Sequence, residues 1–76
     1  MSYVEQLHQK VQESEYSLLA PAFVTHLQKV AHALNTYYWV IPGSNKRGFE
    51  AEIKACAYQW LAEHDVAYEA AHEILN

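Results

Sequence analysis

The fold is decided by residues 21–38, PAFVTHLQKVAHALNTYY. At 100° per residue, one arc of this segment collects its large apolar side chains. They are Phe23, Val24, Leu27, Val30, Ala31, Leu34, Tyr37 and Tyr38. The opposite side carries polar residues such as Gln28, Lys29 and His32. This pattern predicts a core helix whose wide apolar stripe must be covered by the rest of the chain.

The length and composition of the chain limit the kind of protein it can form. Its 76 residues allow one domain over 1–76, and a chain of this size buries only roughly 60% of its unfolded surface. With 51% hydrophobic residues the chain is too apolar to be disordered. Small chains with a marginal core are often completed by association, so a homodimer is an alternative to a monomer.

The charge balance bears on partners and location. A net charge of −4 argues against direct binding to nucleic acid or to an anionic membrane, because few cations are available. The first residues show no basic stretch followed by an apolar run, so no signal peptide is expected. No apolar run approaches the ~20 residues that span a bilayer. These features predict a soluble cytoplasmic protein.

Three more helices are expected around the central one. We predict an all-α bundle of four helices at about 2–14, 20–38, 48–63 and 65–75. Ser2 caps the first helix, with Glu5 completing a capping box, and Pro42 and Gly43 mark the main loop. The core face of the third helix is formed by Phe49, Ile53, Cys56, Ala57, Trp60 and Leu61. Because Cys56 is the only cysteine, an intramolecular disulfide and a thiolate zinc cluster are excluded.

The end of the third helix leaves two alternatives. Its apolar spacing continues to the last residues, but a single helix from Phe49 would be ~40 Å long, which suits an extended dimer and not a compact monomer. Asp65 is a favourable N-cap residue. We therefore expect a break near His64 and a fourth helix from about Val66.

Aromatic and basic residues suggest one interaction surface. Tyr58 points away from the expected core face of the third helix, and Trp39 is either exposed or folded back under the following turn. The adjacent cations Lys46 and Arg47 lie in the main loop. Exposed aromatic residues beside cations are typical of protein interfaces. Two cations are too few to favour stacking on single-stranded nucleic acid.

An acidic series suggests a second surface. Asp65, Glu69 and Glu73 follow one another at intervals of four along the fourth helix, where like charges repel by a few tenths of a kcal/mol. Glu73 also lies near the helix C-terminus, where cations are preferred. This pattern suits the docking of a basic partner surface; the alternative is an ordinary solvated face.

A Glu-x-x-His pattern occurs twice, as Glu5 with His8 and as Glu69 with His72. In di-iron carboxylate bundles such pairs point inward and share a metal. Glu69 and His72 instead fall opposite the apolar side of their helix, so a metal site would need a second chain. The simpler interpretation is two solvated surface pairs, with no metal and no cofactor.

The predicted function follows from these patterns. No Ser/His/Asp constellation, Gly-rich phosphate loop or inward carboxylate pair can be assembled, so we assign no catalytic residue and do not expect an enzyme. We expect a small regulatory or inhibitory module that binds a partner protein through an acidic and aromatic helical surface. Its residues are Trp39, Lys46, Arg47, Tyr58, Asp65, Glu69 and Glu73. The alternative is a metal-binding homodimer that uses the Glu-x-x-His pairs.

Overall fold

The computed structural model describes residues 2–40 and 46–76, with side chains except at 37–40, 46 and 47. This part of the chain forms four α-helices and a short 3-10 turn, without strands. They are α1 (Tyr3–Gln12), η1 (Ser17–Leu19), α2 (Ala20–Val40), α3 (Lys46–Glu63) and α4 (Tyr68–Leu75). The predicted all-α bundle of four helices is confirmed. α2 runs two residues beyond its expected end at 38, a difference that is common at helix termini. Lys46 and Arg47, expected in the loop, are the first residues of α3, and α4 begins at Tyr68 and not at 65.

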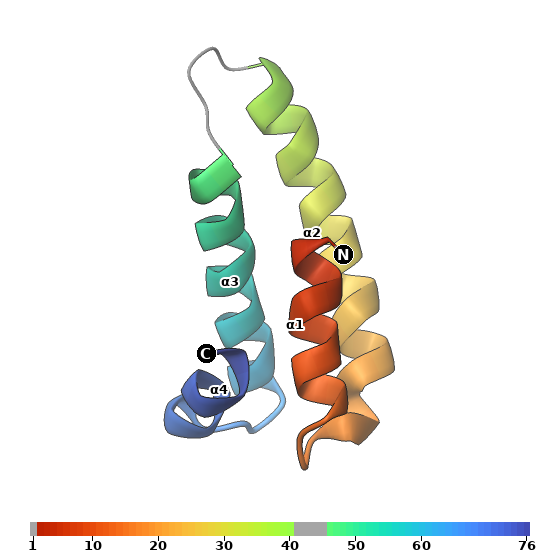
Figure 1. Cartoon of the computed structure of the whole chain (residues 1–76), viewed down its shortest axis with the longest axis vertical. Helices are drawn as coiled ribbons and strands as arrows, with labels where there is room; N and C mark the ends of the chain where they lie inside the picture. The colour runs from red at the N-terminus through yellow and green to blue at the C-terminus, as the bar shows by residue number, and fades with distance from the viewer. Residues whose placement is uncertain (1, 41–45) are drawn as a thin grey trace.

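All four helices pack together at one end of the bundle, where α1 and α4 lie beside α2 and α3. α2 and α3 are an antiparallel hairpin, α1 packs beside the lower part of α2, and α4 folds back at the foot of α3 (Figure 1). α4 also contacts α1, so the four helices close a ring. α2 has 21 residues and α1 only 10, or about 32 and 15 Å, so α1 covers only part of α2. The molecule is therefore elongated, 40 × 22 × 21 Å. Within the described residues, no helix is long and apolar enough to cross a membrane.

Local hydrogen bonds set the start of the first two helices. Ser2 Oγ accepts a hydrogen bond from the backbone N–H of Glu5 at 3.2 Å, which confirms Ser2 as the N-cap of α1. After α1, the Ser14 hydroxyl donates to Val11 O and accepts from the N–H of Tyr16, which stabilises the turn. Pro21 lies in the first turn of α2, where its missing N–H leaves no hydrogen bond unmade.

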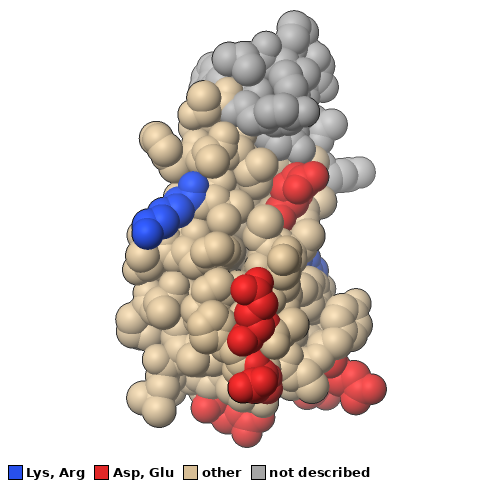
Figure 2. Space-filling model, turned by 180° about the vertical axis from the view of Figure 1, so that it is seen from behind, with Lys and Arg blue, Asp and Glu red and all other residues tan. Residues whose placement is uncertain are grey.

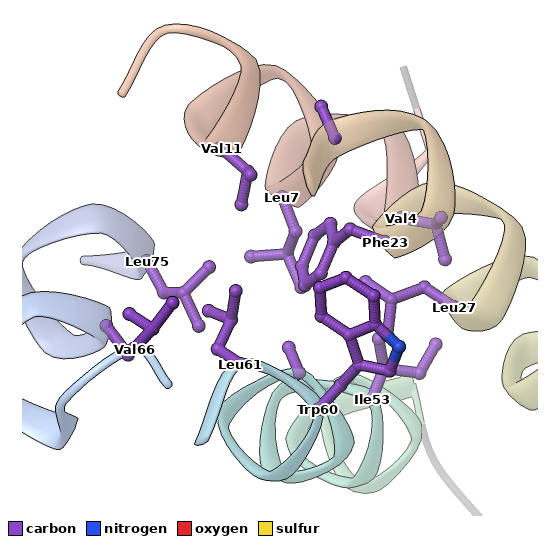
Figure 3. Close-up of a cluster of buried hydrophobic side chains, with 13 residues drawn as sticks. Val4, Leu7, Val11, Phe23, Leu27, Ile53, Trp60, Leu61, Val66 and Leu75 are labelled. Carbon is purple, nitrogen blue, oxygen red and sulfur yellow. The ribbon is translucent and has the colours of Figure 1, made fainter. Parts of the chain in front are cut away.

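The core lies where all four helices meet. Side chains from every helix and from the link before α4 converge there (Figure 3). The buried set is Val4, Leu7, Val11, Ala20, Phe23, Leu27, Ile53, Ala57, Trp60, Leu61, Val66, Ala71 and Leu75. No buried polar or charged residue is found among the described side chains. Cys56, expected on the core face, is half-buried at the edge of this cluster.

Trp60 connects the core to the surface. Phe23 meets its ring edge-on, with the ring centroids 5.5 Å apart. His64 stacks on the indole at 3.7 Å, and His26 lies at 6.3 Å. Nδ1 of His64 is 2.8 Å from the carbonyl oxygen of Trp60, and because a carbonyl only accepts, Nδ1 is the donor. This bond satisfies one of the carbonyl groups left unpaired at the end of α3.

The predicted break near His64 is confirmed, but Asp65 does not cap α4. Asp65 has φ 65°, the left-handed conformation that ends a helix. Its N–H donates to Ala62 O at 3.2 Å, and the N–H of Val66 donates to Leu61 O at 2.9 Å. These two bonds are the Schellman pattern, with Asp65 at the position usually held by glycine. The N-cap of α4 is Ala67, whose side chain makes no capping hydrogen bond.

Two leucines test whether the buried cluster carries the stability. Leu27 is fully buried, whereas Leu18 is 94% exposed. We expect Leu27→Ala to lower the free energy of unfolding by about 2–5 kcal/mol, a large part of the roughly 4–11 kcal/mol expected for 76 residues. Leu18→Ala should change it by less than about 0.5 kcal/mol. Urea unfolding followed by circular dichroism measures both, and equal effects would contradict this assignment of the core.

The backbone at Asp65 makes a second prediction. Glycine has no Cβ to resist a positive φ, so Asp65→Gly should raise the free energy of unfolding by roughly 0.5–1 kcal/mol. For a chain of this size that corresponds to a melting temperature higher by about 2–8 °C. Asp65→Ala keeps the Cβ and removes the same carboxylate, so it is the matched control and should give no gain. A thermal melt in which both variants behave alike would show that the effect comes from the charge.

Candidate functional site

The turn at Asp65 brings aromatic rings from α3 and α4 together. Tyr68 is the first residue of α4, and its ring stacks on Tyr58 of α3 with the centroids 5.2 Å apart and the planes at 23°. His72, one turn further along α4, lies 6.2 Å from Tyr68 at 21°. The three near-parallel rings form a cluster that we call the aromatic platform. It is a product of the tertiary fold, since ten residues separate the two tyrosines in the chain.

Hydrogen bonds hold Tyr58 and His72, the two rings of the aromatic platform on which Tyr68 stacks. The Tyr58 hydroxyl lies 3.2 Å from His72 Nδ1 and accepts a hydrogen bond from Asn76 Nδ2 at 2.6 Å. Asn76 Nδ2 also donates to His72 O at 2.9 Å, and its Oδ1 accepts from Lys54 Nζ. The end of α4 is further held by Lys10 of α1, whose Nζ donates to Leu75 O at 3.2 Å. The platform is thus tied to three helices.

The stacking leaves one face of Tyr68 open. Tyr58 and His72 are in hydrogen-bond contact with each other and nearly parallel to Tyr68, so they lie on the same side of its ring. Tyr68 is accordingly 69% exposed, and among the described residues only it and Leu18 are large hydrophobic residues with such exposure. The surface therefore presents an aromatic face that is backed by two other rings.

Carboxylates surround the exposed side of α4. Asp65, Glu69 and Glu73 are all exposed. Among the described residues, Lys10 and Lys54 make no ion pair with them and instead donate hydrogen bonds to Leu75 O and Asn76 Oδ1 at the end of α4. Acidic side chains also run from the middle to the base of the opposite face of the bundle, where Lys or Arg shows only at the edges (Figure 2). Negative charge is therefore found both on α4 and on the opposite face of the bundle. On α4 it lies beside an exposed aromatic ring.

Tyr3, at the start of α1, lies within electrostatic range of Glu50 and Tyr58 of α3. Burial, and to a smaller extent the charges of Glu50 and Tyr58, raises the pKa of the Tyr3 phenol above its usual value near 10. Tyr3 also lines a groove of about 310 Å³ between α1, α2 and the first turns of α3, together with Ala31, His32 and Phe49. The phenol of Tyr3 is therefore neutral at physiological pH.

The structure separates the residues that the sequence grouped around Trp39. Tyr58 lies about 18 Å further along α3 than Lys46, and it joins α4 instead. It is half-buried and packs against the edge of the core cluster, with Tyr68 stacked on its ring and His72 at hydrogen-bond distance, so it is not the outward residue expected from the sequence. The side chains of Trp39, Lys46 and Arg47 lie outside the described residues, so their predicted role as partner contacts stays a prediction.

The two Glu-x-x-His pairs lie in different places. Glu5 and His8 line a groove of about 650 Å³ between α1 and α2, whereas Glu69 and His72 are exposed on α4. Nδ1 of His72 is already engaged by Tyr58 and Asn76. Among the described residues, no group of three or more His, Cys, Asp or Glu side chains could hold a metal ion. Within the described part of one chain, neither pair gains a third metal-binding side chain.

Sequence analysis missed three members of this site, namely Lys54, Tyr68 and Asn76. Tyr68 could have been found, because it lies at the edge of the apolar side of the fourth helix, about 20° from Leu75, where an aromatic ring can reach solvent. Lys54 and Asn76 gave no such signal. Their roles depend on α4 folding back onto α3, which residue spacing alone does not determine.

Comparison with known proteins gives no matching family model and no match among curated proteins or solved structures. The function is therefore argued from the geometry and the charges of the aromatic platform and its surroundings.

The raised pKa of Tyr3 predicts how stability responds to alkaline pH. The unfolded chain releases the phenol proton near pH 10, before the folded protein does, so ionisation favours unfolding as the pH rises above about 10. Tyr3→Phe has no such proton, so the free energy of unfolding of the wild type, taken relative to that of this variant, should fall from pH 9 to pH 11. Urea midpoints at each pH measure this difference. A difference independent of pH would contradict it, and in a Glu50→Gln background the pH dependence should be weaker, because one cause of the raised pKa of Tyr3 is removed.

Proposed function

We propose that this protein is a small, non-enzymatic interaction module with a regulatory or inhibitory role. In this proposal it binds another protein through the outer face of α4 and the adjoining part of α3. The observation that carries the proposal is the aromatic platform, in which the ring of Tyr68 is 69% exposed and stacks on the ring of Tyr58. Exposed carboxylates lie on the same helix.

The chemistry of the platform suits protein recognition. Tyrosine is enriched among the residues that dominate binding energy at protein interfaces, because it offers a large contact area and few rotatable bonds. Tyr68 has lost much of its freedom to the stack on Tyr58 and His72. A partner that binds Tyr68 would therefore restrict less side-chain motion, and lose less conformational entropy, than it would at an unstacked tyrosine.

Leu18 shows why exposure alone does not define the surface. It is 94% exposed on η1, more than Tyr68, but single apolar residues on a surface are common and need no function. Tyr68 differs because its ring stacks on Tyr58, which is itself hydrogen-bonded to Asn76 and lies at hydrogen-bond distance from His72. The proposal therefore places binding on α4 and not at η1.

Affinity capture from the native host tests this proposal. With the tagged chain as bait, Tyr68→Ala and Glu69→Lys should each reduce recovery of a specific partner about ten-fold, the effect of a dominant interface residue. Glu52→Lys makes the same charge change at an exposed position of α3 and is the matched control. Trp39→Ala tests the other predicted anchor.

The proposal fails if recovery of every specific partner is insensitive to Tyr68→Ala and Glu69→Lys while all variants remain folded by circular dichroism. Equal losses for Glu69→Lys and Glu52→Lys would also contradict it. That result would mean that capture follows net charge and not this surface.

A further inference from the structure

The open face of Tyr68 restricts the chemistry of what can bind there. One side of the ring rests on Tyr58 and His72, and the other side faces solvent. An aromatic face carries partial negative charge, and it attracts a cation or a flat group that stacks on it. Stacking on Tyr58 and His72 favours one orientation of this face.

The charges around Tyr68 favour a cation. Glu69 follows Tyr68 directly in α4, Glu73 lies one turn beyond it, and Asp65 lies in the preceding turn, all three exposed. Among the described residues, the nearby cations Lys10 and Lys54 bind Leu75 O and Asn76 Oδ1 and leave these carboxylates unpaired. A positively charged group that approached Tyr68 would therefore meet both an aromatic face and carboxylates that have no ion-pair partner among the described residues.

We infer that the aromatic platform is the docking site for an arginine side chain on a basic partner protein. The guanidinium stacks on the open face of Tyr68, and the carboxylates of α4 attract the surrounding basic surface. Arginine fits better than lysine because its guanidinium is planar, weakly hydrated and stacks on aromatic rings. This inference rests on the proposed function, and it specifies the partner chemistry that the same surface recognises.

The open ring of Tyr68 favours arginine over lysine as the docked side chain. Carboxylates alone would attract lysine and arginine alike, since both carry one positive charge. An open aromatic face distinguishes them, because contact with a ring is made more often and more favourably by the flat guanidinium. Removal of the ring should therefore abolish the preference while leaving the charge attraction in place.

Two peptides of equal charge test this inference. The probes are acetylated, amidated repeats of Gly-Arg and of Gly-Lys, each with four cations, titrated at low salt into the ¹⁵N-labelled full chain. We expect the arginine peptide to bind roughly two- to five-fold more tightly, the effect of one exposed cation–π contact. The largest chemical-shift changes should lie at Tyr68, Glu69 and Glu73.

Variants separate the ring from the charges. Tyr68→Leu should remove the preference for arginine, whereas Tyr68→Phe keeps the ring and should keep the preference. Glu69→Gln combined with Glu73→Gln should weaken both peptides by a similar factor. Tyr68 is exposed, so neither substitution there opens a cavity, and circular dichroism confirms that each variant is folded.

The inference is overturned if both peptides bind equally, if Tyr68→Leu leaves the preference intact, or if the shifts lie on α1 and α2. Concentration-dependent shifts of the platform without peptide would also overturn it, since a second copy of the chain would then be the occupant. A partner whose capture depends on Glu69 but not on Tyr68 would keep the proposed function and reject the arginine site. An arginine preference without any captured partner would keep the arginine site and reject the proposed function.

Discussion

The backbone reversal at Asp65 is the constraint on which the lower half of the molecule depends. Two main-chain hydrogen bonds close the end of α3, and they require a left-handed residue where the chain has no glycine. The reversal places Val66 in the core and turns α4 back against α1 and α3. Without it, the apolar spacing of the sequence would allow α3 to continue, and α4 would not close the bundle.

The same reversal creates the candidate site. Tyr58 and Tyr68 would lie about 15 Å apart along a continuous helix, and His72 would be further away. In the folded chain their rings stack, and Asn76 bonds to both Tyr58 and His72. Core formation and assembly of the aromatic platform are thus consequences of a single turn. A substitution that disturbs the turn changes stability and the proposed binding surface together.

The fold was largely predictable because apolar periodicity is a local property. The stripe of the central helix, the cap at Ser2 and the break near His64 all follow from spacing and residue type. The role of Asp65 was predicted wrongly, since aspartate is favourable both as an N-cap and in the left-handed conformation, and only the turn geometry decides between them. The platform was only partly predictable: outward positions on α4 could be identified, but not that Tyr58 meets this helix.

The charges of α4 contribute little to holding it in place. With eight residues, α4 is too short to be stable alone, so it depends on tertiary contacts. These contacts are the buried Ala71 and Leu75, together with the hydrogen bonds that Leu75 O and Asn76 make to Lys10 and Lys54. Because the buried side of α4 and its C-terminus provide the anchorage, the outer face can tolerate Glu69 and Glu73 one turn apart at a cost of a few tenths of a kcal/mol. The exposed ring of Tyr68 and these two carboxylates are the features that the proposed recognition of a partner would use.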